Sequence, residues 1–437
     1  MSPGCAQIPG LMRIRFEQGT IVARRVLRVG AERVGYPKGT QVSMKDFSPA
    51  FPKEEGCGGI YVHVPFCRTR CNYCTFVTSP YNPAAVERYI AAVKKEITLW
   101  SSGSVSAELP SNFEVDTLYF GGGTPSLLDP PHVQELLEAC QKAFVFIAHP
   151  EITLEINPAT SDASTLRTLR RAGINRASLG IQSFDDAELA AMGRAHTVRD
   201  ALTTFDDLRS AGFDNISVDL IAGFPGQTRA SVGQSLRAAI GLGPEHVSVY
   251  LLEVKEGSRL ESMIRTGIIT GTDEDLAADL YLDICSTLTC ADYVHYEISN
   301  FARKGRRSKH NLKYWSDRLY LGIGPGAHGM TGHARYANLA GLGEYERDVN
   351  QGRLPVGTWT GLTPETRFAE ALIMGLRLVE GLDLAGLEER YCVDANAFVL
   401  ETIGDLQDAG LFVLADNRLV LTERGRLLSN LVFSRWV

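Results

Sequence analysis

Three cysteines stand close together near the start of the chain, in the segment Cys67-Arg-Thr-Arg-Cys71-Asn-Tyr-Cys74. Structural zinc sites usually take four ligands in two pairs, and no second C-x-x-C or histidine pair lies nearby in the sequence. Three thiolates on one short loop suit three irons of a cubane cluster, whose fourth iron is left for a small ligand. The spacing therefore predicts a [4Fe-4S] cluster held by Cys67, Cys71 and Cys74.

Composition and charge limit the classes of protein that carry this loop. The chain has 437 residues with a formal net charge of -7, which argues against a general nucleic-acid binder. No apolar run approaches the ~18 residues of a membrane span. Nine cysteines are an odd number for a disulfide framework, so a reducing compartment fits better. The six cysteines outside the cluster are expected to be core or incidental thiols: Cys5, Cys57, Cys140, Cys285, Cys290 and Cys392.

Residues 1–55 form an N-terminal extension that we expect to be disordered. Residues 11–33 carry six arginines against two glutamates, which weakly resembles an amphipathic transit peptide. Gly, Pro and the two acids interrupt any long amphipathic face, which favours an unstructured leader, or a true start at Met44. We therefore expect a cytoplasmic protein, with a mitochondrial location as the alternative if residues 1–55 act as a transit peptide.

The elements that must position the cysteine loop alternate between strands and amphipathic helices. The expected strands are Ile60–Phe66, Val115–Gly121, Glu151–Asn157, Arg176–Gln182, Asn215–Gly223 and His246–Glu253. The expected helices are Ala84–Trp100, Pro131–Phe144, Ala163–Ala172, Asp185–Met192, Val198–Ala211 and Arg229–Leu242. Such a series implies a parallel sheet with right-handed crossovers, either an open doubly wound sheet or a barrel.

Polar residues at the strand ends favour the barrel. Cys67, the glycines at 121–123, Glu155, Gln182 and Asp219 lie at or just beyond the carboxyl ends of successive expected strands. In a barrel that edge is one ring around one pocket. The fold class expected is therefore α/β, a partial (β/α)6 TIM-like barrel.

The last part of the chain has a different pattern. We expect a strand at Tyr293–Asn300, then helices without parallel strands from Thr363, a hairpin at Leu411–Leu421 around Asp416-Asn417, and a last helix from Glu423. This order predicts a C-terminal winged-helix-like α+β domain. The boundaries are then 56–300 for the core barrel, 301–360 for a barrel extension and 361–437 for the C-terminal domain.

The cysteine motif after a strand resembles the signature of radical S-adenosylmethionine (SAM) proteins. In that superfamily the open iron chelates the amino and carboxylate groups of SAM, and electron transfer cleaves the sulfonium to a 5'-deoxyadenosyl radical. Gly121-Gly122-Gly123-Thr124-Pro125 resembles the loop that contacts the SAM amino group, since successive glycines let the backbone come close to a ligand.

Longer segments resemble the oxygen-independent coproporphyrinogen III oxidase-like group. They include Tyr61 to Cys67, Glu155-Ile-Asn157-Pro158, Ser178 to Ser183, Gly193-Arg194-Ala-His196 and Asp219 to Thr228, and the match runs from Ile60 to the C terminus. The resemblance implies that the SAM-contacting positions are Tyr61, Tyr73, Gly122, Gly123, Thr124, Glu155, Gln182, Arg194 and Asp219.

The chain differs from the oxidases of that group in one feature, and in a second it resembles the HemW-type heme chaperone branch. Phe76 occupies the place of the oxidases' fourth cysteine, and the segment His310-Asn311-Leu-Lys-Tyr314-Trp315 matches the H-N-x-x-Y-W mark of the chaperones. A histidine can ligate heme iron and aromatic rings can pack on the porphyrin, so His310, Asn311, Tyr314 and Trp315 are candidate heme contacts. His328 is a second candidate, and the basic run before His310 is either a partner for heme propionates or a solvated face.

The sequence thus predicts a heme chaperone that binds a [4Fe-4S] cluster, SAM and heme and delivers heme to recipient hemoproteins. Its expected partners are those hemoproteins and an electron donor such as a flavodoxin-type reductase, with no nucleic acid and no membrane span. One alternative is a radical SAM oxidase that decarboxylates coproporphyrinogen III, so whether the chain is an enzyme stays open. Another is a cluster-dependent binding protein whose C-terminal domain recognises a partner or DNA, although the acidic balance disfavours DNA.

Overall fold

The computed structural model describes residues 57–102, 109–110 and 113–437. The expectations for residues 1–55 and for Cys5 lie outside the described residues. The described chain is an α/β protein whose largest element is one twelve-stranded mixed sheet.

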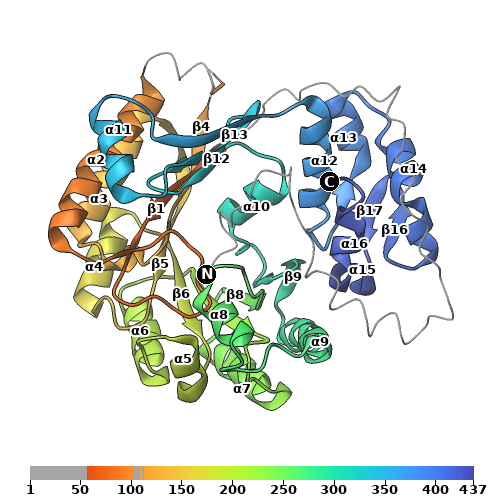
Figure 1. Ribbon diagram of the computed structural model, residues 1–437, viewed down its shortest axis with the longest axis horizontal. Helices are drawn as coiled ribbons and strands as arrows, with labels where there is room; N and C mark the ends of the chain where they lie inside the picture. The colour runs from red at the N-terminus through yellow and green to blue at the C-terminus, as the bar shows by residue number, and fades with distance from the viewer. Residues whose placement is uncertain (1–56, 103–108, 111–112) are drawn as a thin grey trace.

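Six parallel strands in chain order form the centre of that sheet. They are β1 (Gly58–Val64), β4 (Glu114–Gly122), β5 (Val145–Ile156), β6 (Arg176–Gln182), β7 (Ile216–Ala222) and β8 (His246–Leu251). The sheet curves without closing, as Figure 1 shows, so the expected partial (β/α)6 barrel is confirmed.

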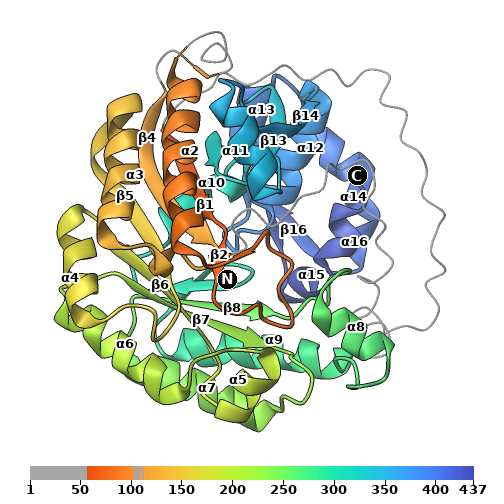
Figure 2. The ribbon, with the colours of Figure 1, turned by 60° about the vertical axis from the view of Figure 1, so that its left-hand side comes forward.

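Helices cover the convex face of the curved sheet, as Figure 2 shows. They are α2 (Pro83–Ser101), α3 (Pro130–Ala143), α4 (Ala163–Ala172), α5 (Asp186–Met192), α6 (Val198–Ser210), α7 (Arg229–Leu242) and α9 (Glu274–Cys290). Side-chain caps start several of them: Asp162 accepts from the Thr165 amide, and Thr197 and Thr228 form capping boxes. Gly173 ends α4 in the left-handed conformation at φ 117°, which glycine adopts without a steric penalty.

Side chains of the six strands alternate between a helix-facing and an inward-facing set. Ile60, Val62, Leu118 and Phe120 belong to the main hydrophobic core, in which the strands pack against the helices. The intervening residues are mostly polar yet buried, among them Thr117, Thr153, Arg176, Ser178, Ser217 and Asp219. The concave face of the sheet is therefore lined largely by buried polar side chains.

Further strands extend the sheet at both ends. β11 (Tyr320–Ile323) lies parallel beside β1, and β12 (His328–Met330), β13 (Ala334–Asn338) and β14 (Val356–Gly361) follow antiparallel. At the other end, β10 (Asn300–Ala302) and β9 (Val294–Glu297) pair antiparallel after β8. The single strand expected at Tyr293–Asn300 was wrong, because the chain turns at Ile298-Ser299, where the Ser299 amide donates to the Glu297 carboxylate.

Residues 364–433 contain the helices and the small sheet of the C-terminal domain. The helices are α12 (Pro364–Gly375), α13 (Leu384–Tyr391), α14 (Ala395–Asp408), α15 (Glu423–Leu427) and α16 (Ser429–Phe433), and the strands are β15 (Leu382–Asp383), β16 (Phe412–Ala415) and β17 (Arg418–Leu421). They enclose a hydrophobic core of their own. Asp416 and Asn417 form the expected hairpin turn with φ of 50° and 59°, and the expected last helix is divided at Leu428.

Short elements connect these parts. β2 (Phe66–Cys67) and β3 (Ser79–Pro80) flank the cysteine loop, and the others are the 3-10 helix η3 (Pro125–Leu127), α8 (Arg259–Arg265), α10 (Lys309–Trp315) and α11 (Leu342–Asn350). Figure 1 shows α10 between the curved sheet and the C-terminal helices. No helix among the described residues has the length and apolar character needed to cross a bilayer.

Candidate metal and cofactor site

The cysteine loop leaves the carboxyl end of β1 and is closed at its base by backbone hydrogen bonds. The Ser79 amide donates to the Pro65 carbonyl at 2.8 Å, and the Tyr81 amide donates to the Cys67 carbonyl at 3.0 Å. Cys67, Cys71 and Cys74 are free thiols on this loop. Burial raises the pKa of Cys74 to about 11, so this sulfur becomes a thiolate only with a cation beside it.

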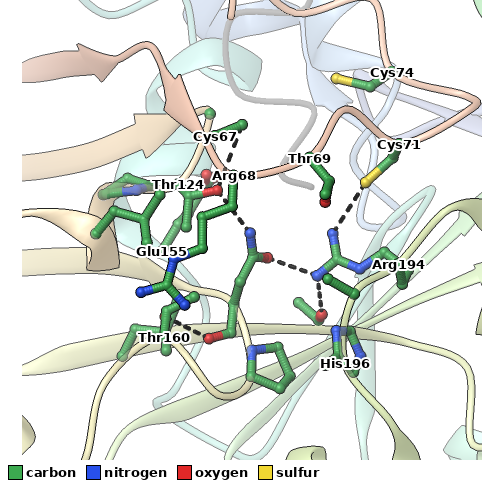
Figure 3. A pocket seen from close by; sticks show the side chains of 18 of the residues that line it. Cys67, Arg68, Thr69, Cys71, Cys74, Thr124, Glu155, Thr160, Arg194 and His196 are labelled. Carbon is green, nitrogen blue, oxygen red and sulfur yellow. Dashed lines mark hydrogen bonds between the residues drawn. The ribbon is translucent and has the colours of Figure 1, made fainter. Parts of the chain in front are cut away.

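A pocket that is open to solvent lies where the loop meets the strand ends. The pocket brings together most of the predicted site residues: Cys67, Cys71, Cys74, Gly122, Gly123, Thr124, Glu155, Gln182, Arg194 and Asp219. In Figure 3 the cysteines lie along one side of this pocket, and Glu155, Thr160 and His196 lie on the other.

The glycine-rich loop after β4 packs directly under the cysteine loop. A Cβ on Gly123 would lie 2.8 Å from the backbone of Pro65 and Phe66, and the Gly123 amide donates to the Val64 carbonyl at 2.8 Å. Gly122 has φ 111°, and a Cβ there would lie 2.6 Å from the His63 ring. Only glycine allows this close approach of the two loops.

Hydrogen bonds join two of the three cysteines through the floor of the pocket. The Thr124 hydroxyl lies 3.5 Å from Cys67 Sγ and accepts from Asn157 Nδ2 at 2.9 Å. Arg194 donates to Asn157 Oδ1 at 2.7 Å and, through its other terminal nitrogen, to Cys71 Sγ at 3.5 Å. The dashed lines in Figure 3 trace this arc from Cys67 to Cys71.

Two carboxylates face the pocket from strands on either side of β6: the half-buried Glu155 on β5 and the buried Asp219 on β7. Glu155 accepts from the Tyr119 hydroxyl at 2.9 Å and from the Gly122 amide at 3.1 Å, and burial raises its pKa. Asp219 accepts from the hydroxyls of Ser178 at 2.8 Å and Ser217 at 2.9 Å. Their orientation is thus fixed before any ligand binds, which suits them to accept bonds from ligand hydroxyl or ammonium groups.

Gln182 ends β6 in an unusual backbone conformation. Its φ is 74°, a region that non-glycine residues adopt rarely and that clusters at functional sites. Its side-chain oxygen is buried and, in the described part of the chain, has no hydrogen-bond partner. A buried acceptor without a partner costs ~1–3 kcal/mol, so this atom fits a ligand donor.

Two predicted SAM contacts do not line the pocket. Tyr61 is 2% exposed on β1 and stacks on Tyr119, with ring centroids 6.0 Å apart. Tyr73 packs in a small cluster with Met192, Ile221 and Phe224 behind the cysteine loop, where burial raises its pKa well above the usual value. Both residues support the pocket wall in this conformation, and their contact with SAM stays a prediction.

Several pocket residues were not among the predicted site positions. Asn157 links Thr124 to Arg194, and His196 lines the pocket while its Nε2 donates to the Ile181 carbonyl at 3.1 Å. Burial lowers the pKa of His196 to about 4, so this ring is neutral at physiological pH. Both residues stand in the segments quoted for the resemblance, which was the available signal, and Asn157 also follows a strand directly.

The H-N-x-x-Y-W segment forms helix α10, and none of its four candidate heme contacts lines the pocket. His310 is 1% exposed near the amino-terminal part of β1 and β4, and Asn311 and Trp315 are also buried. The His310 ring lies 2.8 Å from the Thr117 hydroxyl at Nδ1 and 2.9 Å from the Tyr314 hydroxyl at Nε2. Burial lowers the pKa of His310 to about 3. Axial ligation of heme by His310 therefore requires breaking one of these bonds and exposing the ring.

The second-rank heme candidates also lie outside this pocket. His328 is on β12 and does not line it, and burial lowers its pKa. In the basic run before His310, Arg303 donates to the Ala291 carbonyl at 2.7 Å, and Arg306 and Arg307 pair with Asp214 and Glu380. These three arginines therefore already have partners within the chain.

Comparison with known proteins identifies the family. The sequence model of the radical SAM superfamily matches residues 61–239, and that of the HemN C-terminal domain matches residues 362–428. The heme chaperone HemW of Bacillus subtilis (strain 168) is 32% identical over 380 residues, covering 86% of this chain and 98% of that protein. The chain belongs to the HemW family. HemW of Mycobacterium tuberculosis (strain H37Rv) is 35% identical over 379 residues, covering 86% of this chain and 93% of that protein.

Two other relatives place the family more broadly. The mitochondrial radical S-adenosyl methionine domain-containing protein 1 of Bos taurus is 39% identical over 292 residues, which are 65% of this chain and 64% of that protein. The solved structure of coproporphyrinogen III oxidase (HemN) from Escherichia coli superposes with a TM-score of 0.75 at 24% identity, covering 88% of this chain and 90% of that one. This likeness supports the partial barrel with its C-terminal domain.

Membership of the radical SAM superfamily implies a [4Fe-4S] cluster and SAM, and the residues present fit both. Among the described residues, no three His, Cys, Asp or Glu side chains lie close enough to hold a single metal ion. Three thiolates that each bind a different iron of a cubane do not need to meet at one point. The donor set of Cys67, Cys71 and Cys74, beside the unpartnered Gln182 oxygen, therefore suits a cluster and a polar ligand.

Proposed function

We propose that this protein is a heme chaperone that holds a [4Fe-4S] cluster on Cys67, Cys71 and Cys74, binds SAM in the adjoining pocket and passes heme to recipient hemoproteins. The observation that carries the proposal is the match to HemW relatives along nearly their whole length, together with one pocket that gathers the cysteine loop and polar side chains from successive strands.

The pocket residues divide into those that would hold the cluster and those that would hold SAM. When bound, the cluster supplies one electron at low potential to a ligand on its open iron. Arg194 offers a cation for a carboxylate, Glu155 and Asp219 offer acceptors for hydroxyl or ammonium groups, and Gln182 offers its free oxygen. The glycine backbone at Gly122 and Gly123 leaves room for a ligand to approach closely.

The position of the fourth cysteine supports a chaperone more than a porphyrinogen oxidase. Phe76, which stands there, cannot contribute a thiolate. An electron donor of the flavodoxin type would reach the cluster from the side of the cysteine loop, where Arg68 and Arg70 are exposed. A donor with an acidic surface would be steered toward these arginines, because oppositely charged surfaces favour association.

Heme binding is assigned to α10 in this proposal, with His310 as the axial ligand. Within the described part of the chain, Nε2 of His310 is hydrogen-bonded to the Tyr314 hydroxyl of the same helix, so a rotation of the Tyr314 side chain would free that nitrogen. Tyr314 and Trp315 would then face the porphyrin.

A paired assay on one anaerobic preparation tests the proposal. We expect heme titration to give a saturable Soret shift that is lost in His310→Ala, and we expect no turnover of coproporphyrinogen III under reducing conditions with SAM. A preparation that turns over coproporphyrinogen III and shows no saturable Soret shift would contradict the chaperone assignment. A Soret shift that persists in His310→Ala would show that heme binds elsewhere than at His310, and the protein would still be assigned as a heme chaperone.

A further inference from the structure

Asn157 stands at the centre of the hydrogen-bond arc that joins Cys67 to Cys71. It follows β5 directly and precedes Pro158, which restricts its backbone to extended conformations. Its amide donates to the Ser126 hydroxyl at 3.2 Å, and its carbonyl accepts from the Thr160 hydroxyl at 2.6 Å. Hydrogen bonds from its amide and to its carbonyl therefore fix the backbone of Asn157, and with it the position from which the side chain extends.

The Arg194 guanidinium determines which way the Asn157 amide faces. A guanidinium only donates, so the atom of Asn157 that lies 2.7 Å from Arg194 must be the oxygen. The amide nitrogen then faces Thr124 Oγ1, 2.9 Å away, and donates to it. This assignment follows from chemistry and does not depend on telling nitrogen from oxygen by position.

The direction of the Thr124 hydroxyl follows from the same argument. Because Thr124 Oγ1 accepts from Asn157, its own proton is free to point at Cys67 Sγ, 3.5 Å away. At the other end of the arc, Arg194 donates to Cys71 Sγ at 3.5 Å. Gly180 leaves room for the Asn157 side chain, because a Cβ at this position would lie 3.1 Å from Asn157 Oδ1 and 2.8 Å from the side-chain nitrogen of Gln182.

We propose that Asn157 is a positioning residue for the cluster: by orienting Thr124 and Arg194 it gives two of the three cysteine ligands a hydrogen-bond donor and thereby sets the reduction potential. The inference rests on the proposed function insofar as that function includes the cluster. Hydrogen bonds to cysteine sulfur are among the factors that set the potential, since they favour the more negative, reduced state. Loss of either bond is expected to move the midpoint potential to a more negative value.

The isosteric change Asn157→Asp tests the proposal. Both oxygens of a carboxylate accept, so Arg194 stays bound while the Thr124 hydroxyl must turn its proton from Cys67 to the new carboxylate. We expect full iron and sulfide content after reconstitution and a midpoint potential below that of the parent, measured by spectroelectrochemical titration. The new negative charge alone also lowers the potential, so the change is repeated in a Thr124→Val background, where no hydroxyl remains to turn.

The comparison of the two backgrounds is decisive because the effect of the charge is common to both. The proposal requires a smaller shift from Asn157→Asp in the Thr124→Val protein than in the parent. Equal shifts would overturn it, and so would loss of iron from Asn157→Asp while Thr124→Val keeps its iron.

Asn175→Asp is the matched control. Asn175 precedes β6 at the opposite end of the strands, where it accepts from the Ile152 amide and donates to the Pro150 carbonyl, both at 2.8 Å. We expect its potential to equal that of the parent, and a shift as large as that of Asn157→Asp would overturn the inference. A parent protein that assembles no cluster would instead reject the proposed function, so the two failures are distinguishable.

Discussion

The cysteine-loop pocket and helix α10 are both marked by short motifs, but the structure treats them in opposite ways. The pocket is open and leaves the Gln182 side-chain oxygen buried without a partner among the described residues. In α10, both ring nitrogens of His310 have partners and the ring stacks on Tyr119 at 5.1 Å. The pocket is thus prepared for a ligand, whereas the His310 ring on α10 already has its hydrogen-bond partners.

A sequence motif therefore identifies residues but does not show whether their polar atoms already have hydrogen-bond partners in the fold. Unpartnered polar atoms store a cost that a ligand can relieve, so the pocket residues are expected to contribute more to binding than to stability. Fully bonded buried side chains contribute to stability, so His310 is expected to stabilise the fold of the protein without heme, in addition to its proposed role as a heme ligand. Each of the following changes tests that contrast, beginning with the largest effect.

Cys71→Ala is expected to abolish cluster assembly, because two thiolates cannot hold three irons of a cubane. Iron and sulfide analysis after anaerobic reconstitution measures the effect. The control is Cys290→Ala, which changes an exposed thiol at the end of α9 and is expected to leave the iron content as in the parent. Normal iron in Cys71→Ala would contradict the assignment of the cluster ligands.

His310→Ala is expected to lower the free energy of unfolding by about 2–4 kcal/mol, since it opens a cavity and leaves the Thr117 and Tyr314 hydroxyls without their partner. Denaturant unfolding of the apoprotein measures it. The iron content is expected to stay normal because α10 does not line the pocket. A variant as stable as the parent would show that the hydrogen bonds of the His310 ring do not stabilise the fold.

Acidification is expected to destabilise the fold below pH 6.5, the ordinary pKa of histidine. Burial lowers the pKa of His310 to about 3 and that of His63 to about 4. Between pH 6.5 and about 3 these two histidines therefore bind protons in the unfolded chain but not in the native one. The stability present above pH 6.5 is lost as the pH falls through this range. Unfolding midpoints measured across this range are expected to fall less steeply in His310→Gln, and an unchanged slope would argue against a buried neutral ring.

Gln182→Met is expected to have the smallest effect on the fold and a clear effect on the ligand. Its amide oxygen has no partner to lose, so the free energy of unfolding is expected to change by less than about 1 kcal/mol. SAM affinity is expected to fall roughly tenfold, which corresponds to about 1.4 kcal/mol for one hydrogen bond. Isothermal titration of the reconstituted protein measures the SAM affinity. Unchanged affinity together with lower stability would show that Gln182 stabilises the fold and does not bind the ligand.

The barrel was predictable because its signals are local. The bounds of β6, α4 and α7 agree with the predicted ones, since apolar periodicity and capping residues such as Asp162 and Thr228 mark them. The convergence of Cys67, Glu155, Gln182 and Asp219 also followed, because the carboxyl ends of parallel strands share one edge.

The features of the site that could not be predicted from the sequence depend on contacts between segments far apart in the chain. The role of Asn157 requires Arg194 and Thr124, which lie more than thirty positions away on either side. The burial of His310 depends on Thr117, 193 positions distant, and a helix of seven residues has too few turns to reveal its buried face. Tyr61 and Tyr73 were predicted to contact SAM; neither lines the pocket, and both pack among buried side chains, which the sequence pattern alone does not reveal.

Mössbauer spectra of the protein reconstituted with ⁵⁷Fe, recorded before and after addition of SAM, would show whether three cysteines hold the cluster and leave one iron open. We expect a [4Fe-4S] spectrum in which one iron of four changes its isomer shift when SAM binds, because three thiolates leave that iron open. Four irons that are all thiolate-ligated and unaffected by SAM would contradict it.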